Sequence, residues 1–148
     1  MLRNIDPVLT PELLKVLRAM GHGDDIVVVD QNFPAESVAS STIHGTAIRL
    51  PGLDAPRVMA AIASLLPVDE VPEFPVRRMG VRDEPDNVPE VQQQMYDAIT
   101  EETGAEWPMG SIPWGPFDDE ARKAYAVVQT GEGRPYGCMM LRKGVIFG

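Results

Sequence analysis

The sequence predicts an α/β layered domain with a mixed sheet, on three observations. Stretches with apolar residues at helical spacing alternate along the chain with short β-branched runs, which is typical of helices packed on a sheet. The run Ile26-Val27-Val28-Val29 has no polar position, as expected for a strand covered on both faces. Two further runs, 125–130 and 136–141, flank the turn residues Gly131-Glu132-Gly133-Arg134, which predicts a C-terminal antiparallel hairpin.

Length and composition favour one globular domain, residues 1–148, that is large enough to bury a core. Hydrophobic residues make up 44% and charged residues 24%, as in ordinary soluble proteins. The net charge of −9 leaves no basic face for phosphates, so we expect neither a nucleic-acid partner nor a membrane role. The single cysteine, Cys138, excludes an internal disulfide, and no signal-like or membrane-length apolar segment stands out. The cytoplasm is the expected compartment.

The first expected helix begins at Thr10-Pro11-Glu12, because threonine can cap a free amide and proline suits the first turn. Leu13, Leu17 and Met20 share one face, and Gly21 is the expected left-handed residue that ends the helix. The strand 26–29 follows, and then a loop over 32–35.

The rest of the chain continues the alternation of helices and strands. The expected elements are, in order, a weak strand around 46–50, a helix capped by Asp54 and ended by Pro67, an edge strand within 74–81, a helix from Pro89 to Gly104, and a short helix capped by Asp118 that runs through Lys123. Residues 107–117 hold both tryptophans and three prolines, so we expect an irregular segment there.

The candidate functional residues surround the first strand and recur late in the chain. His22 lies between two glycines just before the strand, and Asp30 follows it. Tyr136 adds a late hydroxyl. Arg78 is either solvated or a donor to an oxygen-rich ligand, and Trp114 either stacks on a sugar or fills a packing contact. Together these groups suit proton transfer on a neutral, oxygen-rich small molecule.

Several other chemistries lack their sequence motifs. No glycine-rich dinucleotide fingerprint, Walker loop or Gly-x-Ser-x-Gly turn is present. A metal held by His22, Asp24 and Asp30 has no support from paired histidines or thiolates, so we expect no metal and no cofactor. Asp24 is instead a candidate to orient the histidine ring.

Two blocks of motifs, one at each end of the chain, carry a family resemblance. The first block contains Ile5, Pro7, Pro11-Glu12-Leu13-Leu14-Lys15-Val16-Leu17, Met20-Gly21-His22-Gly23-Asp24, Asp30 and Phe33-Pro34-Ala35. After Pro89-Glu90-Val91, the last block contains Lys123-Ala124-Tyr125-Ala126-Val127-Val128, Thr130-Gly131-Glu132, Tyr136-Gly137 and Leu141-Arg142-Lys143-Gly144-Val145. Over nearly its whole length the chain resembles the cytoplasmic sugar mutarotases that include L-fucose mutarotase and D-ribose pyranase, and it is closer to the fucose branch.

The resemblance implies a three-layer α/β/α fold and a cofactor-independent isomerase. It implies that His22 is the catalytic acid/base, that Asp30 binds sugar hydroxyls, and that the Tyr136 segment completes the pocket from a neighbouring subunit of a ring-shaped homo-oligomer, often a decamer of two pentamers. Two positions depart from the family pattern. Cys138 stands where asparagine is usual, and Trp114 stands where the fucose branch commonly has arginine.

The expected function is therefore a mutarotase that interconverts the α and β anomers of L-fucose or a similar free monosaccharide. A non-catalytic cytoplasmic monosaccharide-binding accessory protein would use the same pocket. The departures at Cys138 and Trp114 also leave room for a structural oligomer with a relic site.

Overall fold

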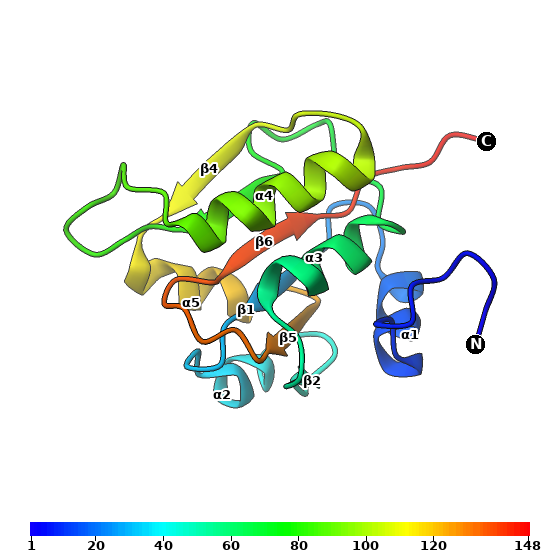
Figure 1. Cartoon of the computed structure of the whole chain (residues 1–148), viewed down its shortest axis with the longest axis horizontal. Helices are drawn as coiled ribbons and strands as arrows, with labels where there is room; N and C mark the ends of the chain where they lie inside the picture. The colour runs from blue at the N-terminus through cyan, green and yellow to red at the C-terminus, as the bar shows by residue number, and fades with distance from the viewer.

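The computed structural model describes residues 1–148 and contains one sheet with helices on both faces (Figure 1). Its elements are α1 (Pro11–Ala19), β1 (Asp25–Val29), α2 (Ala35–Ala39), β2 (Ile48–Leu50), α3 (Ala55–Ala63), β3 (Val76–Met79), α4 (Glu90–Thr103), β4 (Met109–Ile112), α5 (Trp114–Arg122), β5 (Ala126–Thr130) and β6 (Met139–Arg142).

The sheet has the strand order β2-β5-β1-β6-β3-β4 and is mixed, as predicted. Strand β6 is antiparallel to both its neighbours, β1 and β3, and the other neighbouring pairs are parallel. The predicted C-terminal hairpin is wrong, because β1 lies between β5 and β6. A central apolar strand such as β1 needs hydrogen-bond partners along both edges, and β5 and β6 supply one each. Residues 131–138 therefore cross over the end of β1.

The strands alternate their side chains between two cores, which confirms the three-layer α/β/α architecture. Ile26 and Val28 of β1 pack with α1, α3 and α4 on one face. Val27 and Val29 pack with α2 and α5 on the other face. The period of two along a strand thus explains why the four β1 residues after Asp25 are all apolar.

Local signals placed most helix ends correctly. The Thr10 hydroxyl accepts the Leu13 amide at 3.2 Å, and the Asp54 carboxylate accepts the Arg57 amide at 2.9 Å. Gly104 ends α4 with a left-handed φ of 70°. Gly21, however, is not left-handed: α1 ends at Ala19 with Met20 as its C-cap, and the glycine with a left-handed φ, 87°, is Gly23 in the turn before β1.

Two segments differ from the expectation. The short helix α2 follows the predicted loop, and the segment expected to be irregular contains β4 and the start of α5. Asp118 therefore lies inside α5 and does not cap it. Strand β4 lacks β-branched residues except for its last, and its Gly110 is needed because a Cβ there would come within 2.7 Å of the Phe74 ring. Tertiary pairing with β3 overrides the weak local signal.

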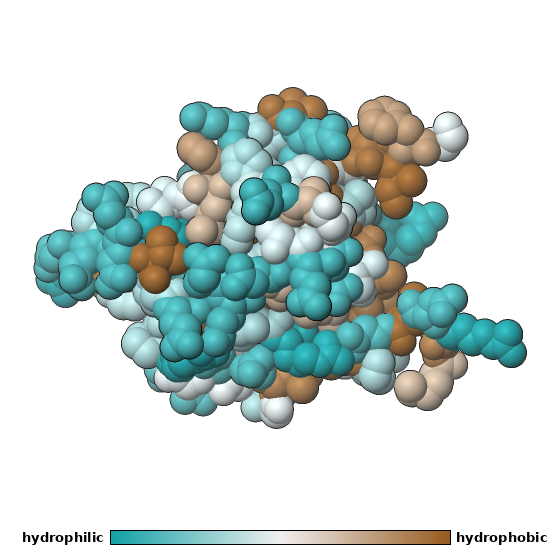
Figure 2. Space-filling model, turned by 45° about the horizontal axis from the view of Figure 1, so that its top comes forward, coloured by the Kyte–Doolittle hydropathy of each residue, from teal (hydrophilic) through white to brown (hydrophobic).

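The surface is mostly hydrophilic on the face that Figure 2 shows, with apolar side chains gathered mainly on the side where Figure 1 places both chain ends. Leu2, Ile146 and Phe147 are among the exposed apolar residues at these ends. No helix combines the length and the apolar character needed to cross a membrane.

Candidate functional site

A pocket of about 420 Å³ opens at the edge of the sheet where the parallel strands end. Asp30 follows β1, Met79 ends β3 and Trp114 follows β4, while Tyr136 and Cys138 precede the antiparallel β6. The remaining lining residues are Asn32, Phe33, Pro34, Asp118 and Pro135. Ligands of open α/β sheets commonly bind at this edge. The structure thus brings together four of the six predicted site residues.

Asp30 is fixed in the pocket by the loop that follows β1. One of its carboxylate oxygens, Oδ1, accepts the Asn32 and Phe33 amides, each at 3.0 Å. The Cys138 thiol lies 3.5 Å from the other oxygen, Oδ2. Burial raises the pKa of the Cys138 thiol well above its ordinary value, so the thiol stays protonated and donates to Asp30. Cys138 therefore acts here as a weak neutral donor and not as a nucleophile.

Tyr136 is held in a backbone conformation that non-glycine residues rarely adopt, with φ 63°. The buried Gln92 amide donates to the Tyr136 carbonyl at 2.9 Å and to the Met79 carbonyl at 2.7 Å. At the other end, the Tyr136 hydroxyl accepts the Arg82 amide at 3.2 Å. Strained conformations persist where the surroundings impose them, often at functional sites. The backbone and the hydroxyl of Tyr136 are therefore both held in place.

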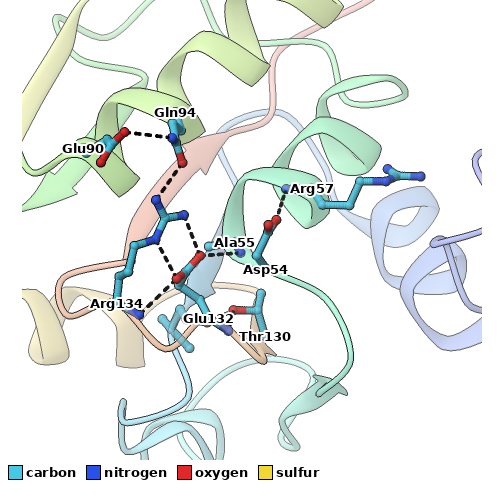
Figure 3. A network of polar contacts seen from close by, with 9 residues as sticks. Asp54, Ala55, Arg57, Glu90, Gln94, Thr130, Glu132 and Arg134 are labelled. Carbon is cyan, nitrogen blue, oxygen red and sulfur yellow. Dashed lines mark hydrogen bonds and ion pairs between the residues drawn. The ribbon is translucent and has the colours of Figure 1, made fainter.

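A polar network anchors the segment 131–138, which forms one wall of the pocket (Figure 3). The buried Glu132 carboxylate accepts Arg134 Nε at 2.9 Å and Nη2 at 3.0 Å, and also the Ala55 amide at the start of α3. Arg134 reaches Gln94 of α4 at 2.8 Å. The Arg134 hydrogen bonds lower the pKa of Glu132 to about 2. This network fastens the segment to two helices.

His22 lies at the opposite edge of the sheet, just before β1. Its Nε2 is 3.0 Å from Oδ1 of Asp69, and the His22 side chain is 48% exposed whereas that of Asp69 is 6% exposed. Burial opposes ionisation of Asp69, but the Val71 amide and then His22 outweigh it and lower the pKa of Asp69. The pair therefore presents an oriented imidazole to solvent. Asp24, expected to orient this ring, instead accepts the Gly21 amide at 2.7 Å.

His22 and the pocket are separated within one chain by the whole length of β1. The strand has five residues, which span about 16 Å at about 3.3 Å per residue. The structure thus does not bring His22 to Asp30 in a single copy.

Arg78 also lies outside the pocket, which corrects the expectation that it reaches a ligand. Its buried guanidinium donates to the Pro85 carbonyl at 2.7 Å and the Asn87 carbonyl at 3.1 Å. Burial lowers the pKa of Arg78, although Asp86 opposes the effect. Arg78 therefore holds the loop over residues 82–88 in place.

Sequence reasoning missed Asp118 and Asp69 as site residues. Asp118 lines the pocket one helical turn after Trp114, and burial raises the pKa of its carboxyl group. Its spacing of four from Trp114 could have revealed it, had the helix start been known. Asp69 carries no local signal, because it lies 47 positions from His22. The structure contains no group of three or more His, Cys, Asp or Glu side chains placed to hold a metal ion.

Comparison with known proteins agrees with this architecture. The chain is 37% identical to the L-fucose mutarotase of Actinobacillus pleuropneumoniae serotype 5b (strain L20) over 145 residues, which cover 98% of this chain and 97% of the relative. It is 37% identical to the fucose mutarotase of Homo sapiens, over 98% of this chain and 94% of that one.

Solved structures are similar to this chain over almost its whole length. A crystal structure described as a putative sugar binding protein is 44% identical, with a TM-score of 0.95 over 99% of this chain and 97% of that one. The fucose mutarotase of Streptococcus pneumoniae in complex with L-fucose is 32% identical, with a TM-score of 0.86 over 99% of this chain and 100% of that one. The RbsD / FucU transport protein family model matches residues 3–146. This chain belongs to the RbsD / FucU family.

Proposed function

We propose that this chain is a mutarotase that interconverts the α and β anomers of a free monosaccharide, L-fucose or a close relative. Relatives that match almost the full chain carry the name fucose mutarotase, and one related structure holds L-fucose. The observation that carries the proposal is the combination of a pocket rich in hydroxyl-binding groups with an exposed, oriented histidine. The same combination suits acid–base chemistry on a sugar.

Mutarotation needs two proton movements and no change of oxidation state. The anomeric hydroxyl loses its proton, the ring oxygen gains one, and the bond between C1 and the ring oxygen breaks to give the open-chain aldehyde. The carbonyl face turns, and the same steps in reverse close the ring. An imidazole has one nitrogen that can take a proton and one that can give a proton. We assign this role to His22, and we assign hydroxyl binding to Asp30 and Tyr136.

The separation of His22 from the pocket supports a site completed between two copies of the chain. In this arrangement His22 of one copy faces the pocket of the next, and a closed ring follows if each copy repeats the contact. We propose a homo-oligomer, a pentameric ring or a decamer of two rings. The cytoplasmic location expected from the resemblance stays a prediction.

An apolar groove near His22 supports association. It lies between α1, the end of α3 and the two chain termini. Lys143 lines it, and the Lys143 backbone carbonyl accepts the amide of Gly23, next to His22, at 2.8 Å. Its apolar lining residues are Leu2, Leu14, Leu17, Leu65, Leu66, Pro67 and Ile146. Apolar surface of this kind is commonly buried between subunits.

The test of the activity is anomer exchange by saturation-transfer NMR on L-fucose, D-ribose, L-rhamnose and D-galactose. We expect the native protein to accelerate exchange of one sugar and His22→Ala to lose about 10²–10⁴-fold. His44→Ala is the matched control, because His44 pairs with Glu12 away from the pocket. Native exchange in His22→Ala would remove His22 from the mechanism.

The shared site has a separate test, complementation between two inactive variants. His22→Ala and Asp30→Asn are purified, mixed under conditions that exchange subunits, and assayed together. If each site takes one residue from each copy, about a quarter of the sites in an equal mixture are intact. No recovery in assemblies shown to be mixed would refute the shared site.

The second candidate function is a non-catalytic monosaccharide-binding protein. It is favoured by the 44% identical structure, which is described as a putative sugar binding protein. Stabilisation of the native protein by a sugar, without anomer exchange, would support this function over catalysis.

A further inference from the structure

The side chains that line the pocket offer no cation. Asp30 and Asp118 contribute two carboxylates, while the side-chain donors are neutral, among them the Asn32 amide, the Trp114 indole and the Tyr136 hydroxyl. A monosaccharide carries hydroxyl and ring oxygens that accept hydrogen bonds as well as hydroxyls that donate. Carboxylates only accept hydrogen bonds, so they can bind the sugar hydroxyls that donate. The sugar oxygens that accept need hydrogen-bond donors from the protein. A charged donor is therefore the group that this pocket lacks.

Arg82 lies beside the pocket and is tied to two of its walls. Its backbone amide donates to the Tyr136 hydroxyl at 3.2 Å. Its guanidinium carbon lies over the Trp114 ring, 5.8 Å from the ring centre. Trp114 lines both the pocket and an adjoining hollow of about 300 Å³ that contains Arg82. Arg82 is thus separated from the pocket by the width of one indole ring.

Apart from its contact with Trp114, the guanidinium of Arg82 has no polar partner inside the chain. It forms no ion pair and donates no hydrogen bond to a protein atom, and the residue is exposed. By contrast, the guanidinium of Arg78 donates to the Pro85 carbonyl, and that of Arg134 donates to the Glu132 carboxylate. Stacking on an indole limits the motion of a guanidinium and leaves its N–H groups at the rim free to donate.

We propose that Arg82 is the cationic donor of the sugar pocket and reaches across the edge of Trp114 to the hydroxyl or ring oxygens of the bound monosaccharide. The proposal rests on the sugar-binding function proposed above and deepens it, because it names a residue that donates hydrogen bonds to the oxygens of the ligand. The aromatic face of Trp114 and the guanidinium then act as one unit, with the loop carrying Arg82 held by Arg78.

The test compares Arg82→Gln with Arg82→Lys and with the control Arg57→Gln. Arg57 is exposed on α3, pairs with Asp6 and does not line the pocket, so its replacement removes the same charge away from the pocket. A hydrogen bond from a charged donor is worth about 10- to 100-fold in affinity, so we expect KM to rise by that factor in Arg82→Gln. We expect kcat and Tm of Arg82→Gln to stay near native values, an intermediate KM for Arg82→Lys, and a native KM for Arg57→Gln.

A double-mutant cycle with Trp114→Leu tests whether the two residues act together. If Trp114 seats the guanidinium, Arg82→Gln should change KM much less in the Trp114→Leu background than in the native protein. Additive effects on KM would overturn the joint unit.

The outcomes separate this proposal from the proposed function. If the native protein exchanges anomers and the KM of Arg82→Gln is native, or rises no more than that of Arg57→Gln, the Arg82 assignment is overturned alone. If the native protein exchanges none of the four sugars, the mutarotase function is overturned. The Kd of each sugar, measured by titration calorimetry on the same variants, then decides the Arg82 assignment, and absence of binding by the native protein overturns it too.

Discussion

Glu132 should give the protein a stability that depends on pH in a defined window. Arg134 lowers the pKa of the Glu132 carboxyl group from 4.5 to about 2, although burial opposes the effect. Each pH unit of difference corresponds to about 1.4 kcal/mol, so the ionised carboxylate stabilises the folded state by about 3 kcal/mol. Because the folded pKa is depressed, this stabilisation is complete above about pH 4.5 and is lost as the pH falls toward 2. Glu132 is only 4% exposed, so solvent screens the contact little.

The measurement is the free energy of unfolding of the native protein and of Glu132→Gln in urea, from pH 7 to pH 2.5, at one fixed protein concentration. We expect Glu132→Gln to be less stable by about 3 kcal/mol at pH 7, and the difference to shrink below pH 4.5. Glu36→Gln is the control, because the Glu36 side chain is 89% exposed and its pairing with Arg49 is long, at 3.4 Å. A difference that does not change with pH would refute the electrostatic reasoning.

Two further variants test other parts of the structure. Asp69→Asn should lower kcat for anomer exchange by about tenfold or more with little change in KM. The reason is that a neutral amide no longer holds His22 in one tautomer. A native kcat in the NMR assay would contradict this. Gly131→Ala should destabilise the fold by about 1–3 kcal/mol, because its Cβ would collide with a backbone carbonyl of the neighbouring loop, whereas Gly115→Ala has open space and should be neutral or slightly stabilising. Equal shifts in Tm by calorimetry would disprove the steric argument.

The sequence alone was sufficient where the signal is local. The caps at Thr10 and Asp54, the buried strand β1 and the helix end at Gly104 all follow from the chemistry of adjacent residues, and all are present. The alternation of these elements was enough to predict an α/β layered domain, because each amphipathic helix must cover a sheet.

Strand partners were decided only by the tertiary structure. The turn residues 131–134 favour a hairpin locally, yet β1 takes both β5 and β6 as partners, so residues 131–138 cross its end. That crossing places Tyr136 and Cys138 beside Asp30 and so creates the pocket wall. Pairing between distant strands depends on the burial of the whole sheet, which no local window of sequence contains.

The same distinction holds for the site. Sequence and resemblance identified Asp30, Tyr136, Cys138 and Trp114, and the structure gathers them in one pocket. The partner of His22 could not be predicted, since Asp69 is far away in the sequence and a hydrogen bond depends on distance in space. The sequence by itself determined most of the elements, but not α2 or β4, and most of the side chains that carry chemistry, but not Asp69 or Asp118. Only the tertiary structure decided which of them meet, because sheet pairing and helix packing are set by contacts between segments that are remote in the chain.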